Sequence, residues 1–201
     1  MTPDTLIALV AFAFATSVTP GPNNLMLLAS GVNFGLRRTV PHMLGIAAGF
    51  TVMVGLVGLG LGPVFAASPA LHAVLKYVGA AYMLWLAWRL SRAGPVGDGA
   101  PVRGRPMRFV GAAAFQWVNP KAWIMALTAT ATYAGPDGGA VDVLLVASVF
   151  GVVNLPCIGV WAAFGAALRR VLSRPAVLRR FNAAMALLLV ASLWPLVAEW
   201  R

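Results

Sequence analysis

The sequence predicts an all-α integral membrane protein, with six transmembrane helices arranged as two inverted three-helix repeats in which helices 1 and 4 are broken. Three observations lead to this fold class. Of the 201 residues, 60% are hydrophobic and only 10% are charged, a composition too apolar for a soluble domain. The apolar residues form stretches of membrane-spanning length. Two of these stretches contain a proline-centred helix breaker at a comparable place.

Six stretches approach the roughly 20 residues that a helix needs to cross the hydrocarbon core of a bilayer. They lie at about Leu6–Leu28, Val40–Leu61, Leu71–Leu90, Phe109–Tyr133, Val143–Leu168 and Leu178–Val197. The first stretch lacks the positively charged leading region of a signal peptide, so we expect it to be retained as a span.

The segment 93–106 is rich in glycine, proline and arginine, which is typical of a linker. It separates a first three-helix half, residues 1–92, from a second half, residues 107–201. Because three is odd, the second half must cross the membrane in the opposite sense to the first. A proline break in the leading helix of each half favours an inverted repeat. The alternative is chance recurrence of two helix breakers.

The net charge of +10 is concentrated in alternate connections between the spans. The arginines of these connections are Arg37, Arg38, Arg89, Arg92, Arg103, Arg105, Arg108, Arg169, Arg170, Arg174, Arg179 and Arg180. The acidic residues Asp4, Asp137, Asp142 and Glu199 lie on the opposite side. The positive-inside rule therefore places the arginine-rich loops in the cytoplasm and both termini outside. Nucleic-acid binding is disfavoured, because the arginines lack interleaved aromatic residues and a soluble module.

The two helix breaks are the strongest indication of a functional site. Each proline lacks an amide hydrogen, so the carbonyls of Thr16, Val18 and Gln116 lose their helical partners. Broken backbone is tolerated at membrane depth only where it is buried in protein or lines a water-filled cavity. We therefore expect the breaks to form a substrate site. Its candidate residues are Pro20, Gly21, Pro22, Asn23, Asn24, Gln116, Asn119, Pro120 and Lys121.

The residue types at the breaks suit a zwitterion. Asn23 and Asn24 are expected to cap the helix that resumes after the first break, with Asn119 in the same role at the second. Two helix starts and the Lys121 ammonium would bind a carboxylate, and the freed carbonyls would receive an ammonium group. Alternatively, Lys121 snorkels to the lipid headgroups. Asn154 and Pro156 form a weaker third break, which either contributes to the site or only kinks its helix.

The sequence lacks the residues that other classes of function require. No acidic residue occurs at mid-depth in any span, so a neutral substrate is favoured over a cationic one. Hydrolase and nucleotide-binding motifs are absent from the sequence, and Cys157 is the only cysteine. His42 and His72 are expected at the membrane interface. We therefore expect no enzyme activity, cofactor or metal. The alternatives are an intramembrane enzyme acting on a lipid-type substrate and a structural membrane subunit.

Four motifs together resemble the lysine exporter family, LysE/RhtB. They are Thr19-Pro20-Gly21-Pro22-Asn23-Asn24, the glycine-rich stretch Gly45–Gly62, the run Gly79–Trp88 that contains Tyr82 and Trp85, and Gln116-Trp117-Val118-Asn119-Pro120-Lys121-Ala122. The Pro-Gly-Pro-Asn-Asn form and the tyrosine-tryptophan run are most similar to the cysteine/O-acetylserine exporter branch.

The resemblance implies a secondary transporter of the bacterial inner membrane. Such a transporter would export amino acids or their derivatives, use the proton motive force and work as a homodimer. Many relatives have an aspartate just after the Pro-Gly-Pro motif, where this chain has Asn23 and Asn24. This departure leaves open the coupling ion and the transport of cationic substrates.

Overall fold

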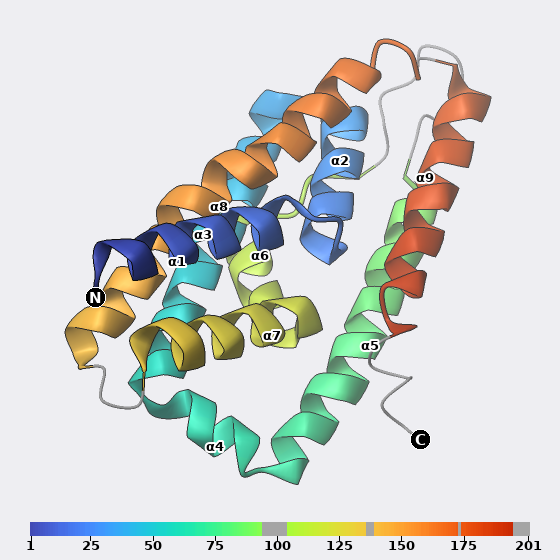
Figure 1. The fold of residues 1–201 in the computed structure, drawn as a ribbon. Coiled ribbons are helices and arrows are strands. Elements are labelled where there is room, and N and C mark those ends of the chain that lie inside the picture. The colour runs from blue at the N-terminus through green and yellow to red at the C-terminus, as the bar shows by residue number, and fades with distance from the viewer. Residues whose placement is uncertain (94–103, 136–138, 173, 195–201) are drawn as a thin grey trace.

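The computed structural model describes residues 1–93, 104–135, 139–172 and 174–194, and every regular element within them is a helix (Figure 1). Most of the linker predicted at 93–106 lies outside the described residues. The same is true of Arg103, Asp137 and Glu199, and of the last residues of the sixth predicted span.

The first predicted span consists of two helices, as the sequence predicted. Helix α1 covers Pro3–Val18, and α2 covers Pro22–Phe34. The two axes are bent by 54° at the break. Proline stands at the first position of each helix, where its missing amide hydrogen costs no helical bond.

The next two spans are long helices. Helix α3 covers Leu36–Leu56 and continues through the π-helical turn η1, Val57–Leu61, into α4, Gly62–Ala66. Gly60 has a φ of 133° and kinks this continuation, a conformation that favours glycine. Helix α5, Pro69–Ser91, begins after Ser68, whose side chain accepts a hydrogen bond from the amide of Leu71.

The fourth predicted span is broken where the sequence predicted. Helix α6, Phe109–Phe115, ends in a 3-10 turn, η2, at Gln116–Val118. Helix α7, Pro120–Ala129, follows and ends in the π-helical turn η3, Thr130–Ala134. The breaking residue is Asn119, which has an extended backbone.

Helix α8, Ala140–Leu168, runs through Pro156 without interruption, and Pro156 is exposed on its surface. The helix is therefore not broken at Pro156, because a proline inside a helix removes one hydrogen bond and can bend the helix without ending it. Helix α9 covers Pro175–Ala191. Among the described residues, three helices are long and apolar enough to cross a membrane, or four if α1 and α2 form one span. Six spans remain a prediction.

Helix α8 packs against α1, α2 and α3, while α6 packs on α3 and α5 on α9 (Figure 1). Small residues allow the closest approaches. A Cβ atom added to Gly31 of α2 would meet the carbonyl oxygen of Ala162, and one added to Gly165 of α8 would meet that of Leu28. Gly45 and Gly49 lie equally close to the backbone of α6, so the glycines serve helix packing.

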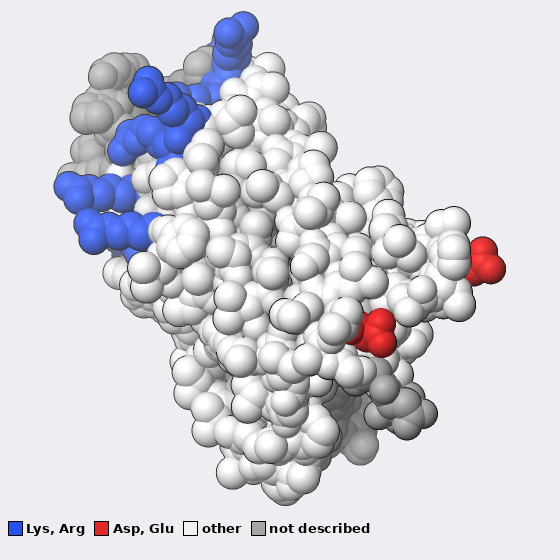
Figure 2. Space-filling model, turned by 90° about the vertical axis from the view of Figure 1, so that its left-hand side faces the viewer, with Lys and Arg blue, Asp and Glu red and all other residues white. Residues whose placement is uncertain are grey.

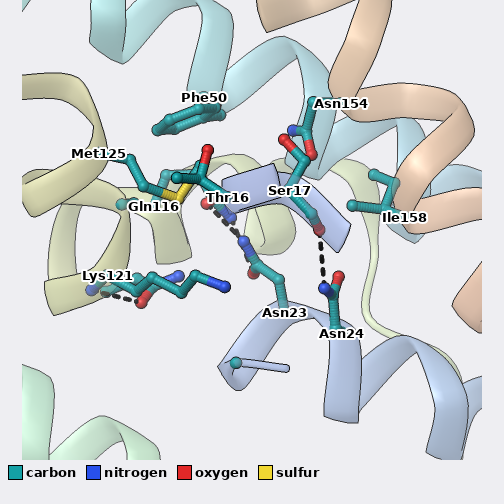
Figure 3. Close-up of a pocket in the computed structure, with 13 residues that line it drawn as sticks. Thr16, Ser17, Asn23, Asn24, Phe50, Gln116, Lys121, Met125, Asn154 and Ile158 are labelled. Atoms are coloured by element: carbon teal, nitrogen blue, oxygen red, sulfur yellow. Dashed lines mark hydrogen bonds between the residues drawn. The ribbon is translucent and has the colours of Figure 1, made fainter. Parts of the chain in front are cut away.

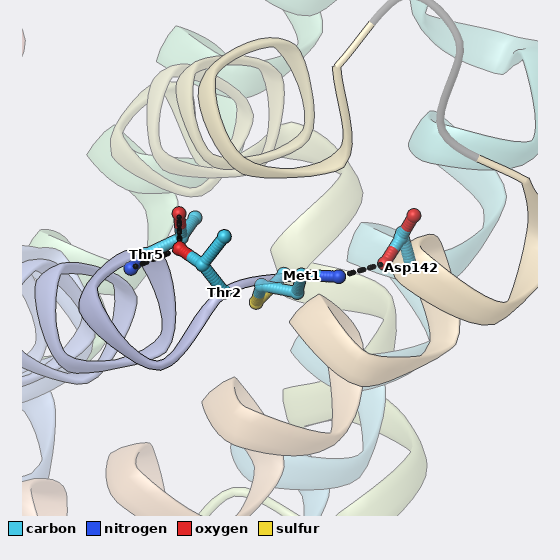
Figure 4. A network of polar contacts seen from close by, with 4 residues as sticks. All are labelled: Met1, Thr2, Thr5 and Asp142. Atoms are coloured by element: carbon cyan, nitrogen blue, oxygen red, sulfur yellow. Dashed lines mark hydrogen bonds and ion pairs between the residues drawn. The ribbon is translucent and has the colours of Figure 1, made fainter.

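Charge is divided between the two ends of the molecule. Figure 2 shows lysine and arginine side chains gathered at one end, whereas the acidic side chains on this face lie toward the other. At the acidic end, the N-terminal ammonium of Met1 pairs with Asp142 at 3.5 Å (Figure 4). Thr2 caps α1 beside this pair and accepts a hydrogen bond from the amide of Thr5 at 3.2 Å. The chain therefore starts at the end opposite the arginines.

Candidate functional site

The two helix breaks meet, although 93 residues separate the side chains that join them. The Asn23 amide donates to Gln116 Oε1 at 2.8 Å, and the Gln116 amide donates to Asn23 Oδ1 at 3.2 Å (Figure 3). Gln116 is completely buried and also donates to the carbonyl of Ala112 at 2.9 Å. Both breaks thus border one polar region inside the protein.

Lys121 makes the second link between the breaks. Its Nζ donates to the carbonyl oxygen of Thr19 and to the hydroxyl of Thr19, both at 2.9 Å, and lies 3.3 Å from the carbonyl oxygen of Pro20. These acceptors follow the last turn of α1, where the helix dipole favours a cation. The ammonium group therefore contacts the opposite break instead of extending away from the site.

Gly21 makes room for the Lys121 side chain. A Cβ atom at Gly21 would lie 2.7 Å from Lys121 Cδ and 3.1 Å from its Nζ. The φ of Gly21 is −175°, so an alanine could adopt this backbone. The glycine is therefore required for the space beside Lys121, and not for its conformational freedom.

Replacing Gly21 with alanine should displace the Lys121 ammonium and leave the fold intact. We expect the transport that the family resemblance implies to slow about tenfold, equivalent to about 1.4 kcal/mol in the activation free energy. Transport by the purified variant in vesicles measures this effect. Gly139→Ala is the matched control, because a Cβ atom there would meet nothing within 4 Å. An unchanged rate for Gly21→Ala would contradict the assigned position of Lys121.

The asparagines of the first break do not cap α2, contrary to the prediction. The cap residue is Gly21, and no side chain bonds to the first turn. Asn24 instead donates to the carbonyls of Ser17 and Thr19, each at 2.8 Å. Asn119 does cap α7, since its side chain accepts from the amide of Lys121 at 3.2 Å.

The carbonyls freed by the prolines already have hydrogen-bond partners. The expectation that they would receive the ammonium group of a substrate is therefore wrong. The Thr16 carbonyl accepts from the hydroxyl of Thr19 at 2.9 Å, and that of Val18 accepts from Trp161 Nε1 at 3.1 Å. The Gln116 carbonyl accepts from the amide of Asn119 at 3.3 Å. Nearly all buried backbone groups find such partners. The acceptors nearest the site are instead the carbonyls of Thr19 and Pro20.

A small cavity lies where the breaks meet. Its lining comprises Thr16, Ser17, Gly21, Asn23, Asn24, Phe50, Gln116, Asn119, Lys121, Ala122, Met125, Asn154 and Ile158 (Figure 3). About 30 Å³ of it is open to the centres of water molecules, room for about two waters. Side chains must therefore move before a larger solute can bind.

Two polar side chains from different helices lie side by side in this cavity. The hydroxyl of Ser17 is buried and makes no hydrogen bond. Asn154 of α8 is 5% exposed, and Figure 3 shows its amide beside Ser17. A buried hydroxyl costs free energy when left unpaired, so Ser17 is suited to a polar ligand, and the adjacent Asn154 amide could bind the same ligand.

The predicted site residues divide into two groups. Gly21, Asn23, Asn24, Gln116, Asn119, Lys121 and Asn154 line the cavity, whereas Pro20, Pro22, Pro120 and Pro156 do not. Pro22 and Pro120 are the first residues of α2 and α7, and thus define where the helices restart. Ser17, Phe50 and Ile158 were missed. Phe50 and Ile158 are apolar residues, and nothing in their neighbouring sequence distinguishes them from other core residues of α3 and α8. Ser17 precedes the break by one turn and could have been included.

Broken helices that meet around a small cavity inside a membrane protein are a feature of many transporters. Comparison with known proteins identifies the group. The family model described as LysE type translocator matches residues 14–192, so the chain belongs to the LysE family. The family resemblance of the four motifs is thereby confirmed, and the protein is a transporter and not an enzyme.

Curated relatives match nearly the whole chain. Proteins named cysteine/O-acetylserine efflux protein from Escherichia coli (strain K12), Escherichia coli O9:H4 (strain HS) and Shigella sonnei (strain Ss046) are each 31% identical over 195 residues. Each alignment covers 94% of this chain and 96% of the relative. No solved structure matches the chain.

Proposed function

We propose that this LysE-family translocator exports small neutral amino acids or derivatives, of the cysteine and O-acetylserine class, by alternating access. The observation that carries the proposal is the Lys121 ammonium, held between two helix breaks in a cavity that also contains the unpaired hydroxyl of Ser17. The relatives named for cysteine and O-acetylserine efflux support the substrate class.

In the proposed mechanism, substrate binding exchanges the partners of Lys121. The lysine ammonium now occupies the Thr19 and Pro20 acceptors, at the negative end of the α1 dipole. An arriving substrate offers its own ammonium to these acceptors, which releases Lys121 to pair with the substrate carboxylate. Both charges of the zwitterion are then satisfied, and no protein charge is left unpaired.

The residues that line the cavity also favour a substrate with a neutral side chain. Phe50, Met125 and Ile158 provide an apolar wall, and no carboxylate among the cavity residues could hold a second cation. Lys121 is the only titratable residue that lines the cavity. We therefore propose that coupling to the proton motive force runs through Lys121.

We further propose six spans in two inverted halves, with α6 and α7 as the fourth span and α9 as the sixth. The packing supports this arrangement. Helix α3 packs on its counterpart α8, and α5 on its counterpart α9. The first span, α1 and α2, contacts α8, the fifth. In the same way, α6 of the fourth span contacts α3, the second. Alternating access would then move one half against the other.

The proposed setting is the bacterial inner membrane, with the arginine-rich end cytoplasmic and the N-terminus outside. The separation of charge between the two ends supports this orientation (Figure 2). The proposed assembly, a homodimer, follows from the family resemblance and stays a prediction.

Purified protein in vesicles loaded with radiolabelled amino acids tests the function. Cysteine, O-acetylserine, threonine, homoserine, leucine and lysine are compared with and without an imposed pH gradient. We expect efflux of the small neutral substrates to exceed that of lysine and to accelerate with the gradient. Absence of efflux for every substrate would contradict the proposal and favour a structural subunit that needs a partner.

A further inference from the structure

A second and larger cavity lies at the arginine-rich end, away from the helix breaks. It is formed by α2, α3, α5, α9 and the segment 104–107, and includes Asn33, His42, Arg89, Arg92 and Arg105. About 290 Å³ is open to the centres of water molecules, compared with about 30 Å³ between the breaks. An amino acid would fit here without rearrangement.

His42 gives the cavity a buried polar group without a partner. Its side chain is 2% exposed, and neither ring nitrogen makes a hydrogen bond. His42 lies near the arginine-rich end, but α3 turns its side chain into the protein. A neutral imidazole always carries one N–H donor, and burying that donor unpaired is unfavourable. A bound acceptor at this position would satisfy it.

The arginines give the cavity a positive charge without an acidic counterpart in the described residues, whose only acidic side chains are Asp4 and Asp142. Asp142 pairs with the N-terminus at the opposite end. The guanidinium of Arg89 lies 4.8 Å from the centroid of the Trp85 ring, a contact that positions an arginine without neutralising it. In the sequence, Asp98 is the only acidic residue between Arg89 and Arg108. The cavity is therefore electrostatically suited to an anion.

We propose that this cavity is a loading site that binds the carboxylate of an amino acid before it reaches the helix breaks. His42 and the arginines donate to the carboxylate, and apolar residues such as Met26 and Leu86 contact the rest of the solute. Helix α2 links the two cavities, since Asn24 lines one and Asn33 the other, about 14 Å apart along the helix. The role as a loading site rests on the proposed function and orientation.

An anionic lipid would offer a similar oxyanion, but the cavity suits it less well. The buried lining contains the side chains of Ser30, Asn33 and His42. A lipid acyl chain placed against these groups would leave the imidazole donor unpaired. A small solute with a carboxylate can reach that donor.

The test is equilibrium binding of radiolabelled O-acetylserine to detergent-purified protein carrying Lys121→Met, which removes the ammonium of the first cavity. We expect this variant still to bind O-acetylserine. Adding His42→Leu or Arg105→Gln should weaken binding about tenfold or more, because each removes a hydrogen bond to a charged group. Arg170→Gln is the matched control, because Arg170 belongs to the same charged end but does not line the cavity. The methyl ester of the same amino acid should bind weakly to all variants.

Several results would overturn the loading site. In the first, Arg170→Gln weakens binding as much as the cavity variants do. In the second, the methyl ester binds as tightly as the free amino acid. In the third, phosphatidylglycerol displaces the amino acid, which would assign the cavity to a lipid. His42→Leu should leave the melting temperature unchanged or raise it, because it removes an unpaired donor. A lower melting temperature would indicate a structural role. If transport fails in vesicles while this binding pattern holds, the cavity is an amino-acid binding site, but the proposed export, and with it the loading role, is wrong.

Discussion

Lys121→Met should reduce the rate of amino-acid export about 100-fold, which corresponds to about 2.7 kcal/mol in the activation free energy. Methionine preserves most of the aliphatic stem beside Gly21 but removes the ammonium that bonds to Thr19 and Pro20. The substrate carboxylate then has no cationic partner. Efflux from vesicles measures the effect, and the melting temperature in detergent shows whether the variant is folded.

Lys121→Arg is the informative companion variant. It retains the charge, but its planar guanidinium does not reproduce the compact ammonium that sits between three acceptors. We expect it to restore only part of the lost rate. Wild-type rates in a folded Lys121→Met variant would show that the ammonium has no part in transport.

Gly165→Ala should have the largest effect on folding. The added Cβ atom would meet the carbonyl oxygen of Leu28 and lie 3.2 Å from the Cα of Gly31. Because these are backbone atoms, relief requires α2 and α8 to separate. We expect a loss of about 3 kcal/mol in the free energy of unfolding, at the upper end of the usual cost of overpacking. Unfolding of the purified protein in detergent measures it.

Gly55→Ala is the matched control in another helix of the bundle. The nearest atom to an added Cβ there is the Cβ of Ala147, at 4.0 Å. Alanine is the better helix former by about 1 kcal/mol, so this variant should be at least as stable as the wild type. Equal stability of Gly165→Ala and Gly55→Ala would mean that α2 and α8 are not packed as described.

Features encoded by local residues could be predicted from the sequence. Pro22 and Pro120 cannot continue a helix, so the positions of both breaks follow from chemistry within a few residues. The same holds for the Asn119 cap, which bonds to an amide two residues away. Pro156 suggested a third break that the structure does not have. Whether a proline kinks or interrupts a helix depends on the residues that surround it.

Features that depend on tertiary packing could not be predicted. The partner of Asn23 is Gln116, 93 residues away, and no local pattern distinguishes that pairing from capping of α2. The inward position of His42 depends on how α3 packs against its neighbours. The sequence therefore located the breaks but not the hydrogen bonds that join them, and it did not suggest the second cavity.

Substrate protection of one introduced thiol tests most directly whether the two breaks enclose the transport site. Cys157 is the only native cysteine, so Cys157→Ser provides a thiol-free background for Thr16→Cys. Thr16 lines the cavity, and its hydroxyl bonds only within its own helix. We predict that saturating O-acetylserine slows alkylation of this thiol about tenfold, and that adding Lys121→Met abolishes the protection. Alkylation at the same rate with and without a substrate that the protein transports would contradict the site.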